Sequence, residues 1–491
     1  MNDPRTILDA LAEMDIHPAG VADDSRQVRA GDLFLAYPGD QADGRRYIAD
    51  AIARGAVAVL WQAGDDFAWD PALTATNLQV ADLRAMAGPL AHLVCGEPSA
   101  GLSLIAITGT NGKTTVSQFI AHAHPRKCAV IGTLGAGFPG AFAETGFTTP
   151  EATTLMPLLA DFSRAGAGAC ALEASSIGIE EGRMNGATVD VAIFTNISRD
   201  HLDYHASMEA YAAAKAKLFA WPGLRCAIVN VDDRFGRWLA GATSAPTVLA
   251  YGMGGKAAVR AENLVATAHG QRFSLVLPDG RAEVETALLG RYNISNMLAV
   301  AAVLHDAGLG VAEVATSLAG LTPPVGRLER VGGDGEPLVI VDYAHTPDAL
   351  ENVLLTLRDV ATARGGELSV VFGCGGDRDK GKRPQMGEVA ARLADRVVLT
   401  SDNPRGEDPL RIIAEIDAGT SAMKIRAESE VDRANAISRA IGTAAASDVI
   451  LLAGKGHEAY QETAGVRTPF FDIDHARAAL ELRRGSRREV A

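Results

Sequence analysis

The chain has 491 residues, which is too long for one hydrophobic core and predicts several domains. Hydrophobic residues make up 47% and charged residues 22% of it, as is ordinary for a soluble globular protein. The formal net charge of −14 argues against nucleic acid or an anionic membrane as a partner, because both require a basic surface. An anionic small molecule would need a local positive site built from Lys, Arg, helix N-termini or metal ions.

The cysteine pattern and the N-terminus both favour a cytoplasmic protein. The 5 cysteines are scattered without a CxxC pair, which argues against a disulfide framework or a structural zinc site. The N-terminal sequence MNDPRTILDALAEM lacks the basic start and the apolar run of a signal peptide. No uninterrupted apolar stretch is long enough to cross a bilayer, so we expect no membrane association.

The first segment mixes short strands with a helix. Asp32–Tyr37 and Ala56–Trp61 have the composition of strands, and Tyr47–Arg54 has a helical pattern. The Gly-Glu-Pro-Ser stretch at Gly96–Ser99 is typical of a linker. We therefore expect an N-terminal domain over residues 1–99.

From Leu102 onward, buried strands alternate with helices, a pattern that predicts an α/β fold. The expected strands before the prolines at Leu321–Gly326 are Leu104–Thr108, Gly168–Glu173, Val189–Thr195 and Cys226–Asn230. The expected strands after these prolines are Leu338–Asp342, Leu368–Gly373, Arg396–Ser401 and Asp448–Ala453. The alternation predicts parallel sheets in a central domain (100–324) and a C-terminal domain (325–491), with sites at the C-terminal ends of the strands.

A glycine-rich loop directly follows the Leu104–Thr108 strand and precedes a helical pattern. Its backbone N–H groups could surround phosphate oxygens, while Lys113 reaches the terminal phosphates and Thr114 holds Mg²⁺. Ile107 stands at the first glycine position of the G-x-x-x-x-G-K-[ST] spacing, and a plain strand-to-helix turn is the alternative. The loop comprises Gly109, Thr110, Asn111, Gly112, Lys113, Thr114 and Thr115.

Two further side chains are candidate cation ligands. Glu173 ends an apolar strand, where a nucleotide-bound Mg²⁺ would need an oxygen ligand, although it could equally be a helix-cap charge. His201 lies in the segment SRDHLDYH, which is too rich in Asp and His to be only a turn. Its neutral imidazole could bind a cation, or it could be an ordinary surface histidine.

A series of ordered motifs resembles the Mur ligases, whose relatives include folylpolyglutamate synthase. The first are GTNGKTT, Glu-x-Ser-Ser after a strand, TNISRDHLDYH, AAAKAKLF and GRYNISNMLAV. The later ones are VGRLER, VDYAHTPDAL, FGCGGDRDKGKRP, SDNPRGEDP and AGKGHE. Near the N-terminus, DSRQVRAGDLFLAYPG is similar to the substrate-binding domain of the later muramyl ligases. The resemblance covers nearly the whole chain.

The resemblance implies a uridine-binding N-terminal domain, a central P-loop ATPase domain and a C-terminal Rossmann-like domain. It implies ATP as co-substrate and Mg²⁺ as cofactor, with Thr114, Glu173 and His201 as metal ligands. Lys215 matches the lysine that the family carries as a carbamate (N6-carboxylysine), which suits a position where Mg²⁺ would repel an ammonium. The catalytic set is then Lys113, Glu173, His201 and Lys215, and further ATP contacts are Asn293, Asn296, Arg327 and Asp342.

The implied acceptor is a UDP-linked muramyl dipeptide used in peptidoglycan synthesis. Its carboxylate would take the γ-phosphoryl group of ATP, and an incoming amine would attack the acyl phosphate. The residues that match the family's muramyl-peptide contacts are Ser25, Thr148, Thr149, Ser175 and Arg183. Ile177 stands where family members often carry His, so no role is assigned to that side chain.

The segment Asp402–Arg405 has the DNPR form, which in the family goes with meso-diaminopimelate. This amino acid is lysine with one more carboxylate, and Arg405 can bind a carboxylate through two parallel N–H···O bonds. A ligand without that carboxylate leaves a desolvated Arg unpaired, and such sites discriminate by about 10⁴–10⁵. A surface salt bridge is the alternative for Arg405. The implied contacts are Arg378, Asp402, Asn403, Pro404, Arg405, Gly454 and Glu458.

The sequence leaves three other functions open: a lysine-adding muramyl ligase, a folylpolyglutamate synthase, and a nucleotide-switched binding protein that ligates nothing. Arg405 argues against the first and the DSR segment against the second. Phosphate release that depends on an added amine would separate a ligase from a switch. We expect a monomer.

Overall fold

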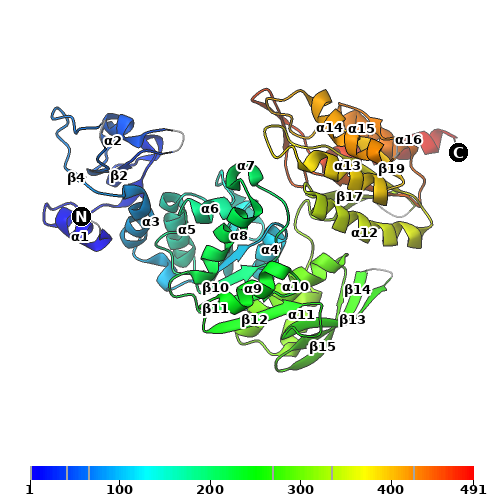
Figure 1. Cartoon of the computed structure of the whole chain (residues 1–491), viewed down its shortest axis with the longest axis horizontal. Coiled ribbons are helices and arrows are strands. Elements are labelled where there is room, and N and C mark those ends of the chain that lie inside the picture. The colour runs from blue at the N-terminus through cyan, green and yellow to red at the C-terminus, as the bar shows by residue number, and fades with distance from the viewer. Residues whose placement is uncertain are drawn as a thin grey trace.

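The structure is a computed structural model and describes residues 3–39, 42–64, 67–267, 270–332, 335–423 and 426–490. Figure 1 shows three lobes: a blue N-terminal lobe, a cyan-to-green central lobe and a yellow-to-red C-terminal lobe. The central lobe lies between the other two.

The N-terminal lobe is built on a parallel sheet with strand order β1-β2-β3-β4. Every residue of β2 is buried, as expected for a strand in a sheet covered on both faces. The strands are Gly20–Ala22 (β1), Asp32–Ala36 (β2), Ala58–Trp61 (β3) and Asn77–Gln79 (β4). The helices are Pro4–Ala12 (α1), Ile48–Ala53 (α2) and Leu83–Val94 (α3), with 3₁₀ turns at Ser25–Gln27 (η1), Gly44–Tyr47 (η2) and Pro98–Ala100 (η3).

The central lobe has a sheet of order β15-β14-β13-β12-β11-β10-β5-β9-β6-β7-β8. The strands from β13 to β6 are parallel, and both edges are antiparallel. The parallel strands are Ser103–Thr108 (β5), Cys128–Gly132 (β6), Ala169–Glu173 (β9), Val191–Phe194 (β10), Cys226–Asn230 (β11), Thr247–Gly252 (β12) and Val259–Thr267 (β13). The edge strands are Gly135–Phe138 (β7), Ala141–Ala143 (β8), Gly270–Leu277 (β14) and Gly280–Thr286 (β15).

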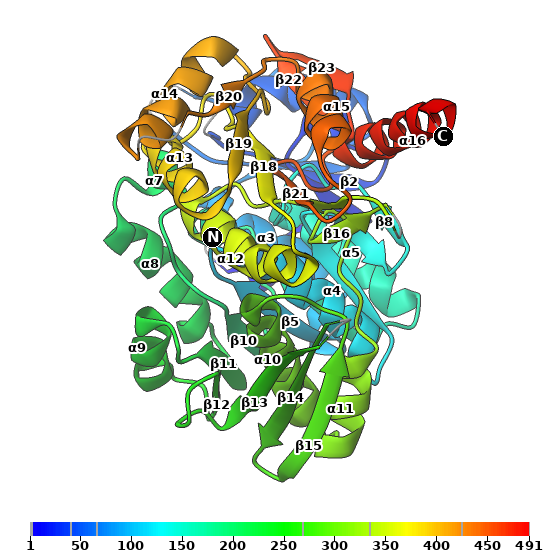
Figure 2. The ribbon, with the colours of Figure 1, turned by 90° about the vertical axis from the view of Figure 1, so that its right-hand side faces the viewer.

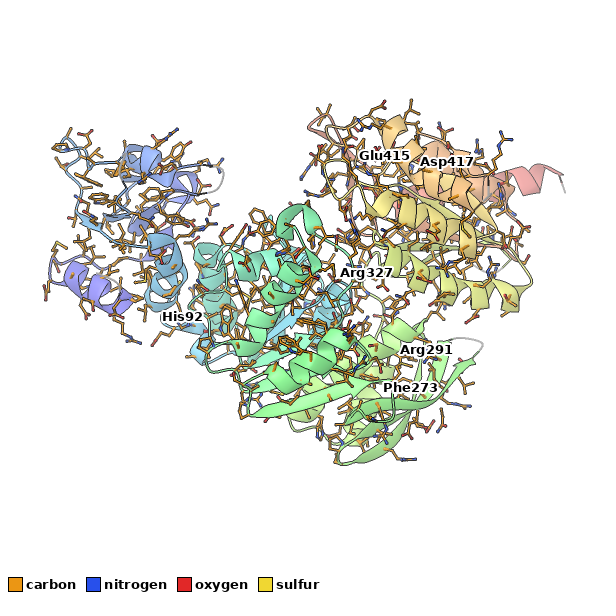
Figure 3. The ribbon with its side chains drawn as sticks, viewed as in Figure 1. His92, Phe273, Arg291, Arg327, Glu415 and Asp417 are labelled. Atoms are coloured by element: carbon orange, nitrogen blue, oxygen red, sulfur yellow. The ribbon has the colours of Figure 1, made fainter. Side chains whose placement is uncertain are left out.

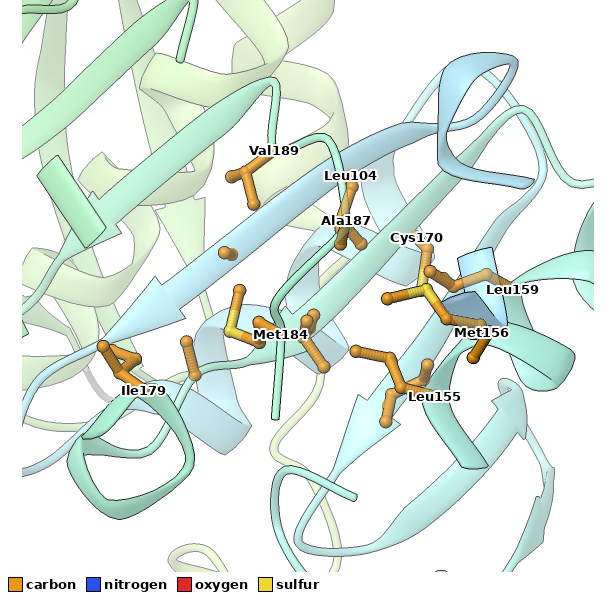
Figure 4. Close-up of a cluster of buried hydrophobic side chains, with 14 of the residues drawn as sticks. Leu104, Leu155, Met156, Leu159, Cys170, Ile179, Met184, Ala187 and Val189 are labelled. Atoms are coloured by element: carbon orange, nitrogen blue, oxygen red, sulfur yellow. The ribbon is translucent and has the colours of Figure 1, made fainter. Parts of the chain in front are cut away.

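Helices cover the parallel part of this sheet. In Figure 4, Leu155, Met156 and Leu159 of one helix pack in the same buried cluster as Leu104 and Cys170 of the strands. The helices are Lys113–Ala123 (α4), Ala152–Arg164 (α5), Ser176–Glu180 (α6), Leu202–His205 (α7), Met208–Ala216 (α8), Arg234–Ala242 (α9), Arg291–Asp306 (α10) and Val311–Ala319 (α11), with a 3₁₀ turn at Lys217–Ala220 (η4).

The C-terminal lobe has a second sheet, of order β16-β17-β21-β18-β19-β20, which is parallel except at β16. The strands are Glu329–Val331 (β16), Leu338–Asp342 (β17), Leu368–Phe372 (β18), Arg396–Leu399 (β19), Glu428–Ser429 (β20) and Val449–Ala453 (β21), followed by the hairpin Tyr460–Thr463 (β22) and Val466–Pro469 (β23). The helices are Pro347–Arg364 (α12), Lys382–Leu393 (α13), Pro409–Ala422 (α14), Arg433–Thr443 (α15) and Asp472–Val490 (α16).

The α/β class and the parallel order of the inner strands are confirmed, and every expected strand is present within a few residues. The antiparallel extension β13–β15 was not expected; Figure 2 shows it as green arrows at the bottom of the central lobe. β15 alternates exposed and buried residues, so it lacks the apolar run that identifies the inner strands. The sheets lie inside the three expected segments, whose boundaries stay predictions. None of the described helices has the length and apolar character needed to cross a bilayer.

Candidate active site

The glycine-rich loop joins the C-terminal end of β5 to the N-terminus of α4. Gly109 and Gly112 have φ angles of +147° and +90°, which glycine adopts without strain. A Cβ atom on Gly109 would lie 1.9 Å from Thr195 Oγ1, so close packing also requires glycine there. The Lys113 ammonium donates to the carbonyl oxygens of Gly109 (2.8 Å) and Thr110 (3.1 Å), which folds this side chain over its own loop.

The same loop is bonded to the segment that follows β10. The Asn111 carbonyl accepts from Thr195 Oγ1 (2.6 Å) and from Asn196 Nδ2 (3.0 Å). The Asn111 N–H donates back to Asn196 Oδ1 at 3.0 Å. The Tyr211 hydroxyl of α8 lies 3.1 Å from Thr110 Oγ1. These bonds fix the backbone of the loop before any phosphate arrives.

Glu173 is fully buried at the end of β9 and faces this loop. Its carboxylate accepts from the hydroxyls of Thr114 (2.9 Å) and Thr133 (3.0 Å) and from the Thr133 N–H (3.1 Å). A Cβ atom on Gly132 would lie 2.1 Å from Glu173 Oε1, so the carboxylate occupies space that only glycine leaves open. The structure therefore brings together two of the expected Mg²⁺ ligands, Thr114 and Glu173.

A cluster of charged groups lies beside the loop. Lys215 is 1% exposed, and its ammonium lies 4.3 Å over the Tyr211 ring. Burial and the charge of Lys113 hold the pKa of Lys215 well below its usual value. Burial also lowers the pKa of His201, which favours the neutral imidazole. Burial raises the pKa of Asp200, but electrostatic interactions with His201, His345 and Lys382 together bring it down to about 2.

The donors beside the loop suit a Mg²⁺ ion that is shared with a nucleotide. Mg²⁺ prefers oxygen ligands and is usually held by one or two carboxylates together with substrate phosphates and water. Within the described ranges, no group of three or more His, Cys, Asp or Glu side chains could hold a metal ion by itself. The adjacent Thr114 hydroxyl and Glu173 carboxylate offer oxygen donors, and a neutral His201 lies in the neighbouring loop. This set fits an ion that arrives with phosphate.

Arg327 and Asp342 come from the start of the C-terminal lobe. Figure 3 shows Arg327 where the central and C-terminal lobes meet; its guanidinium lies 3.4 Å from Thr114 Oγ1 and 4.6 Å from the centre of the Tyr343 ring. Asp342 accepts from the Leu328 N–H (2.8 Å), and burial raises the pKa of this carboxyl. Asp342 therefore fixes the backbone beside Arg327.

A cavity of about 110 Å³ lies between the glycine-rich loop and the C-terminal lobe, lined by Asn293, Asn296, Arg327 and Asp342 among others. Asn293 Nδ2 donates to the Leu289 carbonyl at 2.8 Å. Small-molecule sites usually exceed about 300 Å³, so a nucleotide requires this space to widen. A cavity of about 730 Å³ on the α12 side is larger, but no residue of the glycine-rich loop lines it. The smaller cavity is therefore the one that the glycine-rich loop lines.

Polar contacts join the central and C-terminal lobes next to these groups. Asn111 Nδ2 donates to Asp348 Oδ2 of α12 at 3.2 Å. Arg199, in the loop after β10, forms an ion pair with Asp379, in the loop after β18 (3.2 Å). The two lobes thus meet through loops that both carry predicted site residues.

The residues expected to bind the muramyl peptide form a bonded cluster at the ends of β9 and α5. Thr149 Oγ1 donates to the Glu173 carbonyl (2.7 Å), accepts from the Ser175 N–H (2.9 Å) and lies 3.0 Å from Ser175 Oγ. Arg183 donates to the Thr149 carbonyl at 3.0 Å. Thr148 Oγ1 lies 3.2 Å from Thr133 Oγ1, which links the cluster to the Glu173 site.

Ser25 lies apart in sequence, buried in η1 of the N-terminal lobe. Nearby Asp23 accepts from the Thr153 hydroxyl of α5 (2.9 Å), so the N-terminal lobe contacts the central lobe beside the muramyl-peptide cluster. Arg183 is also paired with Glu181 (2.5 Å) and Glu151 (3.3 Å). Two carboxylates thus fix the position of this arginine.

Arg378 and Arg405 flank the same glycine of the C-terminal lobe. A Cβ atom on Gly375 would lie 2.9 Å from Arg405 Nη1 and 3.7 Å from Arg378 Cγ. Arg405 has a left-handed backbone (φ +50°), and its Nη1 donates to the Gly376 carbonyl at 2.9 Å. The Arg405 N–H donates to the Glu462 carbonyl of the β22–β23 hairpin (3.0 Å). The Arg405 guanidinium therefore lies next to the loop that carries Arg378.

Beside these arginines lies a buried network of Asn403, Glu458 and Lys455. Asn403 Nδ2 donates to Glu458 Oε2 at 2.7 Å, and the Lys455 ammonium donates to Asn403 Oδ1 (3.1 Å) and Glu458 Oε2 (3.2 Å). A Cβ atom on Gly454 would lie 2.7 Å from Asp402 Oδ2. Burial and the Asp402 charge raise the pKa of Glu458.

Sequence reasoning missed residues that hold this site in shape: Thr133, Asn196, Asp200, Tyr211 and Lys455. Asn196 and Asp200 follow a strand within a motif, so their position could have identified them. Thr133 and Tyr211 carried no such signal. Lys455 lies between two glycines, and nothing local predicts that its charge is buried.

Comparisons with known families match most of the chain in three consecutive parts. Residues 17–94 match the model for the Mur ligase family, catalytic domain. Residues 107–304 match the Mur ligase middle domain, and residues 326–456 match the Mur ligase, glutamate ligase domain.

Individual relatives match over nearly their whole length. The UDP-N-acetylmuramoyl-L-alanyl-D-glutamate–2,6-diaminopimelate ligase of Janthinobacterium sp. (strain Marseille) is 47% identical, with 97% of each chain covered. The ligase of the same name from Pseudomonas aeruginosa is 49% identical, with 96% of each covered. A solved structure of a ligase of this name has a TM-score of 0.68 at 38% identity, covering 95% of each chain. The MurF ligase from Thermotoga maritima in complex with ADP, 18% identical, shares the fold with a TM-score of 0.65 over 96% of this chain and 99% of that one. This chain belongs to the Mur ligase family.

Proposed function

We propose that the chain is an ATP-dependent ligase that adds meso-2,6-diaminopimelate to UDP-N-acetylmuramoyl-L-alanyl-D-glutamate in peptidoglycan synthesis. The observation that carries the proposal is the position of the Arg405 guanidinium at Gly375, in the loop that carries Arg378 and beside the bonded pair of Asn403 and Glu458. A substrate end that bears both a carboxylate and an ammonium needs both signs of charge in one place. The relatives that match nearly the whole chain carry the name of this ligase.

Positive charge at the glycine-rich loop supports the first chemical step. The muramyl-peptide carboxylate and ATP are both anionic, so they approach each other only where cations offset their charge. Lys113 and Arg327 supply such charge near Thr114. Bound Mg²⁺, held through Thr114, Glu173 and His201, would supply more. The carboxylate oxygen attacks the γ-phosphorus, the bond to the β-phosphate oxygen breaks, and ADP leaves with that electron pair.

The second step joins the amino acid to the acyl phosphate. Thr149, Ser175 and Arg183 would hold the acceptor peptide, while the C-terminal loops present the amino acid. Its uncharged amine attacks the carbonyl carbon, and the tetrahedral intermediate collapses to amide and phosphate. Because water would hydrolyse the acyl phosphate, the site must be closed, and the Arg199–Asp379 pair between the lobes suits that closure.

We also propose that Lys215 is carbamylated. Burial and Lys113 disfavour its ammonium form, so the side chain is available as a neutral amine. The amine nitrogen forms a bond to the carbon of CO₂ and loses a proton, which leaves an anion. An anion at this buried position would offset Lys113 and orient Mg²⁺, whereas an ammonium would be repelled.

The substrates also suggest where the enzyme works. ATP and UDP-linked sugars are charged metabolites of the cytoplasm, so we infer a cytoplasmic enzyme.

A substrate panel tests the proposal. The purified chain is incubated with ATP, Mg²⁺ and the UDP-muramyl dipeptide, together with meso-diaminopimelate, L-lysine or no amino acid, and ADP and the UDP-linked product are measured. We expect product only with diaminopimelate. A preference for L-lysine would replace the proposed substrate, and ADP release that is independent of any amino acid would favour a nucleotide switch.

A further inference from the structure

We propose that Lys455 is a positioning residue for the amino-acid substrate: its buried ammonium fixes the Asn403 amide and the Glu458 carboxylate in the orientation that receives diaminopimelate. This inference rests on the proposed function. Lys455 is 0% exposed, and its ammonium donates to Asn403 Oδ1 (3.1 Å) and Glu458 Oε2 (3.2 Å).

The hydrogen bonds around Asn403 permit only one orientation of its side-chain amide. Asn403 Oδ1 accepts from the Lys455 ammonium and from the Glu462 N–H at 3.0 Å. Because both of these neighbours are donors, the amide oxygen must face them, and Nδ2 then donates to Glu458 Oε2 at 2.7 Å. Without the Lys455 ammonium, only the Glu462 N–H would remain to hold the amide in this orientation.

The backbone around Lys455 keeps its side chain in place. Gly454 and Gly456 have φ angles of +108° and +52°. Cβ atoms there would lie 2.7 Å from Asp402 Oδ2 and 2.7 Å from Tyr343 Cβ. The turn is therefore packed between the loop after β19 and the loop after β17, and a fully buried lysine within it has little room for another rotamer.

Charge supports the same role. The groups that face Glu458 are Asp402, Lys455, Tyr343, Tyr460 and Arg433. Burial and Asp402 raise the pKa of Glu458, whereas the Lys455 charge and the Asn403 and Lys455 hydrogen bonds oppose that rise. An ionised Glu458 is the form that can pair with a substrate ammonium. Lys455 thus acts on the substrate through Glu458 and need not touch it.

The main alternative is that Lys455 serves only to stabilise the C-terminal lobe. A stabilising role predicts a lower melting temperature but unchanged KM values for the enzyme that remains folded. A positioning role predicts a selective effect on diaminopimelate. It also predicts a changed pH dependence, because losing Lys455 raises the pKa of Glu458 further and leaves it protonated over a wider acidic range.

The test uses Lys455→Met, Lys455→Arg, Glu458→Gln and the Lys455→Met/Glu458→Gln double variant of the full chain, with Arg396→Met as a control. Arg396 lies in the same lobe and pairs with Glu428 (3.1 Å), away from this network. KM for each substrate and kcat are measured across pH 6–9, after circular dichroism has established that each variant is folded. The double variant and Lys455→Arg keep the test valid if Lys455→Met does not fold.

We expect Lys455→Met to raise KM for diaminopimelate by about 10- to 100-fold, the cost of one charged hydrogen bond, with kcat and the KM for ATP within about 3-fold. The rise should be largest at acidic pH, Lys455→Arg should recover part of the loss, and Arg396→Met should match the wild type. The double variant should have a KM for diaminopimelate only slightly higher than that of Glu458→Gln alone.

The inference is overturned if Lys455→Met raises the KM for diaminopimelate by the same factor in the wild type and in Glu458→Gln. An unchanged pH profile of this KM would also overturn it. In these cases the wild type still ligates diaminopimelate. A wild type that does not use diaminopimelate would instead overturn the proposed function itself.

Discussion

The glycine-rich loop and the amino-acid loops both lie at the C-terminal ends of parallel strands, but they are held in different ways. The glycine-rich loop, residues 109–115, is one continuous segment whose backbone is bonded to the Thr195 hydroxyl and the Asn196 side-chain amide. The amino-acid site takes side chains from loops after β18, β19 and β21, and buried charges connect these loops.

Arg383 is the first of these buried charges. It is fully buried and donates to the Gly375 carbonyl (3.1 Å), to Glu407 (2.9 Å) and to Glu415 (2.7 Å). Glu407 in turn accepts from the Asp377 N–H at 2.7 Å. This one guanidinium therefore joins the loop that carries Arg378 to the loop that carries Arg405.

Arg433 connects the remaining loops. Its guanidinium donates to the carbonyls of Ser401 (3.4 Å) and Ala453 (3.0 Å), and pairs with Asp472 of α16 at 2.6 Å. Both partners of the ion pair are 0% exposed. Single changes in the glycine-rich loop should therefore alter the chemistry and leave stability intact, whereas changes in the buried charges of the C-terminal lobe should alter stability as well.

Lys113→Ala should give the largest loss of activity and so tests the first half of this comparison. We expect kcat/KM to fall by about 10³-fold or more, because the ammonium that neutralises the phosphates is gone. Its bonds to Gly109 and Thr110 lie within one loop, so the melting temperature should hardly change. ADP formation and a thermal melt check both parts, with Lys217→Ala as a control. Gross unfolding would make Lys113 structural.

Lys215→Ala should reduce ligation by about 10²- to 10³-fold, the usual cost of losing one preorganised electrostatic group. Formate or acetate should restore part of the activity by filling the place of the carbamate. In the wild type, removing CO₂ should lower the rate and bicarbonate should restore it. Because a carbamate forms from the neutral amine, this dependence should become stronger as the pH falls through the lowered pKa of Lys215. Full activity of the unrescued variant would exclude the carbamate.

Asp472→Asn tests the other half of the comparison. It leaves the buried Arg433 without its charged partner, and breaking such a pair costs about 3–5 kcal/mol. We expect a clear drop in the melting temperature of the C-terminal lobe, which calorimetry or circular dichroism can measure. Nucleotide binding to the central lobe at low temperature should change much less. If Asp472→Asn were as stable as Lys113→Ala, changes in the two regions would not differ in their effect on stability.

Arg405→Lys keeps the charge but loses the planar fork, so we expect the KM for diaminopimelate to rise by about 10- to 100-fold. Arg405→Ala should be worse, yet it should not give an efficient lysine ligase, because Arg378 stays beside Gly375 without a carboxylate to bind. The measurement is kcat/KM for diaminopimelate and for L-lysine in the wild type and both variants. Wild-type kinetics in either variant would contradict the assignment.

The glycine-rich loop could be predicted from the sequence, whereas the buried charges of the amino-acid site could not. The strands, the glycine-rich loop and the ends of β9 and β10 depend on local apolar runs and on residues a few positions apart, so the sequence reveals them. Whether an arginine or lysine is buried depends on partners far along the chain. Arg433 and Asp472 are 39 residues apart, and Lys455 and Asn403 are 52 apart. The resemblance named Arg378 and Arg405, but only the structure shows that the Arg405 guanidinium returns to Gly375 in the Arg378 loop.

The ion pair between Arg199 and Asp379 should give the smallest effect, because the arginine side chain is 43% exposed and such pairs contribute at most about 1 kcal/mol. Asp379→Asn removes the charge and keeps an oxygen for the Gly381 N–H, which Asp379 Oδ1 accepts at 2.8 Å. We expect KM for ATP to rise by less than about 5-fold, through weaker contact between the lobes. Salt screens exposed pairs, so the difference from the wild type should shrink between about 0.05 M and about 0.5 M NaCl. Arg199→Gln should have the same effect, and combining both changes should add little to either. A loss above about 10-fold that persists in high salt would show that this contact orders the amino-acid loop as the buried charges do.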